Sequence, residues 1–122
     1  MNLQLSLKRE WFEMTKAGIK TEDYREITPY WIKRFLYAHK EDMTTSGFIE
    51  YIQSKKSNQY YADNFSFKKF SANIMTLGYP KSTDTERILM LEHGGIEIRT
   101  GNPEWGAEPG KIYFVIKHGR IL

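Results

Sequence analysis

The densest group of polar residues in this chain is an eight-residue segment, GIKTEDYR, that begins at Gly18. On an extended strand alternate side chains point to opposite faces, so the segment divides into two sets: Lys20, Glu22 and Tyr24, and Thr21, Asp23 and Arg25. Either set brings charge inward, and buried charge is costly unless it is paired. The pattern therefore suggests a functional site. The alternative is an edge strand whose ion pairs are solvated.

These residue types fit two kinds of chemistry. For ligand binding, Lys20 and Arg25 would contact phosphate or base oxygens, and Asp23 would accept from a base amine. For catalysis, a desolvated Lys20 would act as base or nucleophile while Asp23 or Glu22 orients water. In the structural alternative, Lys20 and Asp23 only pair with each other.

Aromatic residues make up 15% of the chain, more than a small core needs. Tyr24, Tyr30 or Trp31 would stack on an unpaired base, and Trp105 lies on a Gly/Pro-rich loop that could close over a cleft. The alternatives are core packing for Trp31 and plugging of one barrel end for Trp105.

The elements that position these residues follow from hydrophobic period and capping signals. Four are expected first: a strand over 3–7, a helix over 9–17, a strand over 20–26, and a helix from Pro29 to about Tyr37. Gly18 suits a left-handed helix end, and Thr28 suits a helix N-cap.

The rest of the chain reads mainly as strands. The expectations are an insertion over 38–64 with a helical turn or two opened by Ser46, a strand over 65–74 with a bulge at Lys68-Lys69, and a strand over 111–117. Gly94-Gly95 marks either a tight hairpin or a bulge in one long strand. Early helices followed by strands predict an α+β domain, 1–122, built on a small β-barrel with two or three flanking helices.

Composition excludes several kinds of site and permits others. The chain has 122 residues, no cysteine and a net charge of +3, which excludes disulfides and zinc–thiolate sites and permits a polyanionic partner. His39, His93 and His118 show no metal-ligand spacing, so we assign no metal and no cofactor. The N-terminus lacks a signal-peptide pattern and no run is long enough to span a membrane, so we expect a cytoplasmic protein. The oligomeric state stays open.

The charged segment resembles the signature of the ASCH domain family, a PUA-like β-barrel family with the pattern GxKxxExR. Gly18, Lys20 and Arg25 match, whereas Asp23 replaces the usual Glu. The preceding strand and helix and the closing stretch 105–116 support the resemblance, which covers most of 3–36 and 65–122.

The resemblance implies binding of RNA or a nucleotide-like ligand in a cleft beside the signature. Some small family members are amidohydrolases of N4-acylated cytidine, in which the motif lysine and a threonine at the position of Asp23 are catalytic; Lys20 carries over and the threonine does not. We therefore expect an RNA- or nucleotide-binding protein. The alternatives are an amidohydrolase that uses Lys20 and Asp23, and a non-catalytic protein-interaction module.

Overall fold

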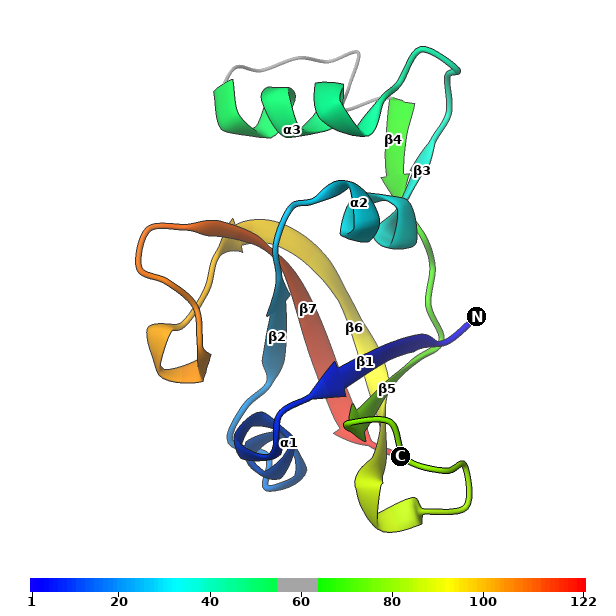
Figure 1. Ribbon diagram of the computed structural model, residues 1–122, viewed down its shortest axis with the longest axis vertical. Helices are drawn as coiled ribbons and strands as arrows, with labels where there is room; N and C mark the ends of the chain where they lie inside the picture. The colour runs from blue at the N-terminus through cyan, green and yellow to red at the C-terminus, as the bar shows by residue number, and fades with distance from the viewer. Residues whose placement is uncertain (55–63) are drawn as a thin grey trace. The chain divides into compact units, whose positions relative to one another are not determined.

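The computed structural model describes residues 1–54 and 64–122. These residues form two compact units. The first comprises Met1–Arg25 and Lys69–Leu122, and the second comprises Glu26–Lys68. Figure 1 labels the elements of both units. The charged segment belongs to the first unit.

A five-stranded mixed sheet, in the order β1-β5-β6-β7-β2, forms the first unit. Its strands are β1 (Leu3–Leu7), β2 (Glu22–Arg25), β5 (Ala72–Leu77), β6 (Ile88–Thr100) and β7 (Ile112–Ile121). β1 pairs with β5 in parallel, and the other three pairs are antiparallel. The α-helix α1 (Arg9–Lys16) joins β1 to β2, and the connections include two 3₁₀ helices, η1 (Thr85–Arg87) and η2 (Pro103–Trp105).

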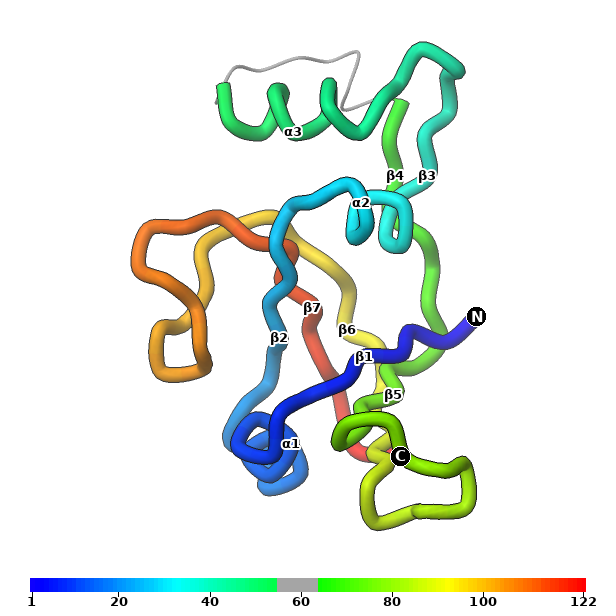
Figure 2. Tube along the Cα trace, in the orientation of Figure 1, coloured from blue at the N-terminus to red at the C-terminus, as the bar shows by residue number. Residues whose placement is uncertain are grey.

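The sheet curls so that its two edge strands approach each other (Figures 1 and 2). Arg25, at the end of β2, donates from Nη2 to the carbonyl oxygen of Ser6 on β1 over 3.1 Å. Because β1 and β2 are the first and last strands of the sheet, this hydrogen bond links its open edges. The sheet is a half-barrel, which confirms the expected barrel-like α+β architecture.

Alternating side chains of the strands build the core of this unit. Leu3, Leu5 and Leu7 are buried on β1, with exposed polar residues between them. On β7, Phe114 and Ile116 are fully buried on one face, and Val115 is fully buried on the other, so this strand has no solvent-facing side there. The leucine and β7 strands therefore form where the sequence predicts them.

Helix α1 also forms where expected, one residue shorter than predicted. It ends at Lys16, and Gly18 follows with a φ of 76°, in the left-handed region that glycine adopts at low cost. The backbone N–H groups of Ile19 and Lys20 both donate to the carbonyl oxygen of Met14, at 3.0 and 3.1 Å. This turn fixes Lys20 directly in front of β2.

The Gly94-Gly95 pair is a bulge inside one long strand, β6, and not a hairpin. The β6–β7 register shifts between Leu91 and His93 and again between His93 and Ile96. A Cβ on Gly94 would lie 3.1 Å from the backbone oxygen of Lys117, so the close approach of the two strands favours glycine there. The bulge re-aims His93, which pairs with His118 across the ladder.

The second unit contains two helices and a two-stranded sheet. Its elements are α2 (Pro29–Phe35), β3 (Leu36–Ala38), α3 (Thr45–Ser54) and β4 (Phe65–Phe67), with β3 and β4 antiparallel. Thr28 caps α2 as predicted, because its hydroxyl accepts from the N–H of Trp31 over 3.5 Å. Thr44, rather than the predicted Ser46, caps α3 by accepting from the N–H of Gly47 over 3.0 Å.

Three strand predictions need correction. The strand expected over 20–26 is shorter and begins only at Glu22. The expected bulged strand over 65–74 is two strands in different sheets, because 65–67 pairs with β3 while 72–77 pairs with β1 and β6. The strand over 111–117 continues to Ile121.

Two helix predictions also differ from the structure. The helix expected to reach Tyr37 ends at Phe35, since Leu36–Ala38 pairs with β4 instead. Helix α3 spans ten residues rather than one or two turns. The proposal that 38–64 is an insertion in a single domain stays a prediction, and its part over 55–63 lies outside the described residues.

The α+β class with three α-helices is confirmed for the described residues. No helix in this part of the chain has both the length and the apolar character needed to cross a membrane.

Candidate functional site

Lys20 and Asp23 form a buried ion pair in the first unit. Lys20 Nζ donates to Asp23 Oδ1 and also to the carbonyl oxygen of Glu22, the latter over 2.6 Å. The side chains of Lys20 and Asp23 are only 1% and 3% exposed. Lys20 lies in the turn before β2, so strand alternation does not govern it. Its side chain therefore joins Asp23, which corrects the expectation that the two point to opposite faces.

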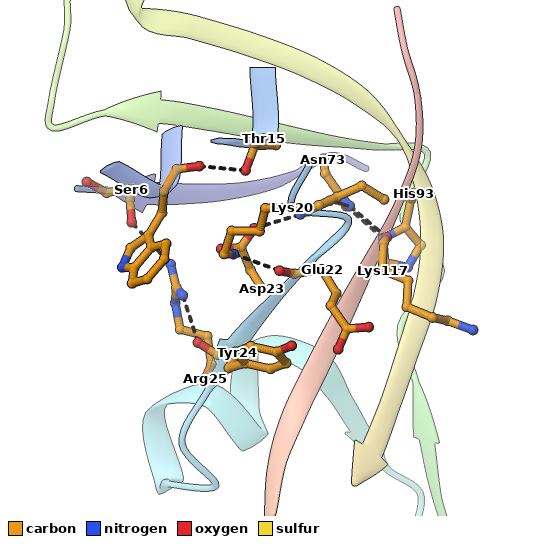
Figure 3. Close-up of polar contacts among 12 residues, drawn as sticks. Ser6, Thr15, Lys20, Glu22, Asp23, Tyr24, Arg25, Asn73, His93 and Lys117 are labelled. Carbon is orange, nitrogen blue, oxygen red and sulfur yellow. Dashed lines mark hydrogen bonds and ion pairs between the residues drawn. The ribbon is translucent and has the colours of Figure 1, made fainter. Parts of the chain in front are cut away.

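A chain of partly buried hydrogen bonds continues from Asp23, and Figure 3 labels Asp23, Asn73 and His93 among its members. Asp23 Oδ2 lies 2.6 Å from His118 Nε2, and His118 Nδ1 lies 2.7 Å from Asn73 Nδ2. Asn73 Oδ1 lies 2.7 Å from His93 Nδ1. We call Lys20, Asp23, His118, Asn73 and His93 the polar relay. It joins the β2 edge of the sheet to β7, β5 and β6.

Burial governs the electrostatics of the relay. It lowers the pKa of Lys20 below its usual value, although the adjacent Asp23 carboxylate opposes this shift. Burial also acts against the ionised form of Asp23, but the hydrogen bond from His118 and the charge of Lys20 outweigh it, so the pKa of Asp23 is lowered. Burial lowers the pKa of His93 as well. The surroundings thus favour the ionised form of Asp23 and disfavour the protonated forms of Lys20 and His93.

Two aromatic rings flank the Lys20 ammonium. Its Nζ lies 5.9 Å from the ring centroid of Trp11 and 5.8 Å from that of Tyr24, and both rings are partly exposed. An ammonium carries three N–H donors, and Asp23 and Glu22 accept two of them. Within residues 1–54 and 64–122, no oxygen or nitrogen accepts the third. Among these residues, the third N–H therefore has only the faces of Trp11 and Tyr24 as recorded neighbours.

Tyr24 is anchored by the connection between β6 and β7, which Figure 2 traces in orange as it folds back toward β2. The backbone N–H of Asn102 donates to Tyr24 Oη over 2.8 Å, and the ring packs on Ala107, Tyr113 and Val115. Burial raises the pKa of Tyr24 to about 12. A Cβ on Gly101 would lie 2.4 Å from Tyr24 Cε1, so this position accepts only glycine.

Trp105 lies on η2 in the same connection and is partly exposed. The next residue, Gly106, has a φ of 98° and packs on Trp11, because a Cβ there would lie 3.0 Å from Trp11 Cζ2. The connection thus contacts both rings that flank Lys20.

Two further residues of the charged segment serve other contacts. Arg25 donates to the carbonyl oxygens of Tyr24 at 2.8 Å and Ser6 at 3.1 Å, so it links the two sheet edges. Glu22 faces away from the relay and forms a bidentate pair with Arg99, with both distances 3.0 Å. The side chains of Lys20 and Asp23 are thus brought together, whereas Glu22 contributes only its backbone carbonyl oxygen.

Tyr30 and Trp31 belong to helix α2 in the second unit. Tyr30 is 59% exposed, and its ring meets that of Trp31 edge-on at 4.8 Å. Trp31 stacks on Phe35 at 5.2 Å, which agrees with the packing alternative, and the guanidinium of Arg34 lies over the rings of Tyr30 and Trp31. Their role in ligand binding stays a prediction.

Sequence analysis missed four residues of the site: His118, Asn73, His93 and Trp11. A signal for His118 was present, because it continues the even-numbered inward series of Phe114 and Ile116 on β7. His93 lacked such a signal, since its direction depends on the bulge.

A binding site for a planar ligand or a proton-transfer site would both suit this arrangement. The described residues hold no group of three side chains arranged to bind a metal ion. Searches of family models, curated proteins and solved structures gave no match.

Proposed function

We propose that the protein binds a nucleobase-bearing ligand, either single-stranded RNA or a mononucleotide, at Lys20. The observation that carries this proposal is the Lys20 ammonium, which keeps one N–H without an acceptor among the described residues and lies between the rings of Trp11 and Tyr24. A base carbonyl or a phosphate oxygen is a suitable acceptor, and an aromatic ring is a suitable stacking surface.

Access to Lys20 requires a local movement, because its side chain is 1% exposed. The ligand would enter where Trp11 meets the connection carrying Trp105 and Gly106. Trp11 or Trp105 would then stack on the base, and stacking contributes about 1–3 kcal/mol per base.

The resemblance of Gly18, Lys20 and Arg25 to the ASCH signature supports the same proposal. We propose that the chain is an ASCH-like domain of the PUA-like superfamily. In this assignment Lys20 contacts the ligand, Asp23 holds Lys20, and Arg25 closes the sheet edge beside them.

Affinity measurements on one matched pair of variants test this function. Lys20→Met removes the ammonium and keeps an unbranched apolar side chain, whereas Lys16→Met makes the same change on the exposed end of α1. Fluorescence anisotropy of a labelled single-stranded RNA, with competition by AMP, CMP, GMP and UMP, would separate the two ligand sources. Circular dichroism would verify that each variant is folded.

We expect Lys20→Met to weaken binding about tenfold or more, as loss of a hydrogen bond from a charged group does, and Lys16→Met to have little effect. Equal affinity of folded Lys20→Met and the unaltered protein would remove the proposal. Equal weakening by both variants would indicate general charge attraction instead.

A second candidate is an amidohydrolase acting on an N4-acylated cytidine. Its specific support is the pairing of a carboxylate with a lysine whose pKa burial lowers, because a neutral amine can act as base. Asp23 would orient water in place of a threonine nucleophile. Chromatographic detection of cytidine released from N4-acetylcytidine, lost in Lys20→Met, would support it. No turnover across a panel of acylated nucleosides would exclude it.

A non-catalytic interaction module is the remaining alternative. It predicts that Lys20→Met lowers stability and changes neither nucleotide binding nor turnover.

A further inference from the structure

Asn73 is the fully buried centre of the polar relay and uses all of its polar atoms. Its Nδ2 donates to the carbonyl oxygen of Lys117 over 3.1 Å and to His118 Nδ1, and its Oδ1 accepts from His93 Nδ1. It is 0% exposed, so water cannot replace any of these partners.

The contact with Lys117 fixes the direction of this amide. A backbone carbonyl only accepts hydrogen bonds, so the NH₂ group must face it. Reversal of the amide would set Asn73 Oδ1 against the carbonyl oxygen of Lys117, two acceptors that repel each other. Asn73 can therefore have only one orientation in this environment.

The orientation of Asn73 sets the proton position on His118. Since Asn73 donates to Nδ1, that nitrogen carries a lone pair, and the ring proton lies on Nε2. Nε2–H then donates to Asp23 Oδ2 over 2.6 Å. The other carboxylate oxygen, Oδ1, is thereby directed toward Lys20.

We infer that Asn73 and His118 are positioning residues of the Lys20 site: the Asn73 amide holds His118 in its Nε2–H tautomer, and His118 fixes the Asp23 carboxylate that holds the Lys20 ammonium between Trp11 and Tyr24. Neither residue contacts the ligand. Their effect on binding rests on the proposed function, whereas their effect on Lys20 does not.

A measurement without ligand tests the inference in the unaltered protein. Nitrogen-15 chemical shifts from long-range NMR correlations report which imidazole nitrogen carries the proton. We expect a protonated Nε2 and an unprotonated Nδ1 on His118 at neutral pH, and a protonated Nδ1 on His93. A proton on His118 Nδ1 under these conditions would overturn the inference.

Two substitutions of His118 distinguish its hydrogen bond to Asp23 from the volume that its ring fills. His118→Gln places an amide N–H near the former Nε2 and can still donate to Asp23, whereas His118→Leu fills space without a donor. The nitrogen-15 signal of Lys20 Nζ should stay near its original position in His118→Gln and shift in His118→Leu. Equal shifts in the two folded variants, or none in either, would contradict a positioning role.

Asn73→Asp reverses the polarity at the centre of the relay. A carboxylate oxygen would replace the NH₂ group, so it would accept from a protonated His118 Nδ1. We expect the nitrogen-15 shifts to report protons on both nitrogens of His118. An unchanged Nε2–H tautomer in this variant, if folded, would show that Asn73 does not set the proton position.

Affinity for a labelled single-stranded RNA and for CMP supplies the functional readout. We expect His118→Leu to weaken binding about tenfold or more and His118→Gln to weaken it much less. If the unaltered protein binds neither probe, the proposed function fails, and the Lys20 Nζ signals alone decide the positioning role.

Discussion

Two neighbouring acids on β2 show how burial separates similar side chains. Asp23 points into the half-barrel, is 3% exposed and is held by Lys20 and His118. Glu22 points to the opposite face, where it joins Arg99 in a surface network that continues through Glu97 to Lys117. Both acids are paired. They differ in the access of water.

This comparison separates the two parts of the charged segment by the free energy that each ion pair contributes. Exposed ion pairs contribute about 0–1 kcal/mol, because water and salt screen them. Water and salt do not reach a buried charge, so removing its partner leaves an unpaired charge inside the protein. That loss destabilises the fold strongly. Both groups carry perturbed pKa values, but only in the relay is burial the first cause for every shifted group that it contains, and this is where we propose that the ligand binds.

The largest expected effect is the loss of unfolding free energy when Asp23, the buried acid, is removed. Asp23→Ala would leave the Lys20 ammonium and His118 Nε2–H without an acceptor, so we expect a loss of about 3–5 kcal/mol in unfolding free energy. Glu22→Ala, the matched change on the outer face, should cost less, because its partner Arg99 is 40% exposed and water can solvate the guanidinium. Urea denaturation monitored by circular dichroism measures both. Equal losses would break the comparison.

A double-mutant cycle with Lys20→Met and Asp23→Ala measures how strongly the two buried side chains stabilise each other. Lys20→Met should cost less in the Asp23→Ala background than in the unaltered protein, because the buried charge then has no carboxylate partner to lose. Strict additivity would mean that the two side chains do not stabilise each other.

A smaller effect concerns pH. The pKa of His93 is lowered in the folded protein, so as the pH falls the unfolded chain takes up the His93 proton at a higher pH than the folded protein does. The stability contribution is therefore present above pH 6.5 and is lost as pH falls through the folded pKa. His93→Asn keeps a donor for Asn73 and cannot titrate there, so it should flatten stability against pH in this window. An unchanged slope would contradict the assignment to His93.

The smallest expected effect lies in the outer network. Glu97→Gln removes the carboxylate shared by Arg99 and Lys117, all on the solvent side of the sheet. We expect no resolvable change in the thermal midpoint, since water solvates both cations. A clear loss that added salt abolishes would show that the outer network also supports the fold.

Local signals predicted much of the first unit. The alternating leucines of β1 and the Gly18 helix end depend on neighbours in sequence, and both formed as expected. The predicted strand at β7 also formed, but it is buried on both faces from Tyr113 to Ile116 and does not alternate. The split of 65–74 into two strands could not be predicted, because it depends on distant pairing partners.

The candidate site was only partly predictable for the same reason. Lys20 and Asp23 stand three residues apart, so their proximity was accessible from the sequence. Asn73 and His93 join them through the β5–β6 pairing and the bulge of β6, which a sequence without homologues does not reveal.

The most direct test of ligand binding at Lys20 is an NMR titration of the unaltered protein with single-stranded RNA and, separately, with CMP. The account predicts that the Lys20 Nζ and Trp11 indole N–H signals change most, with the amide signals of the 101–107 connection changing alongside them. Saturable binding that leaves these signals unchanged and shifts a different surface would contradict it.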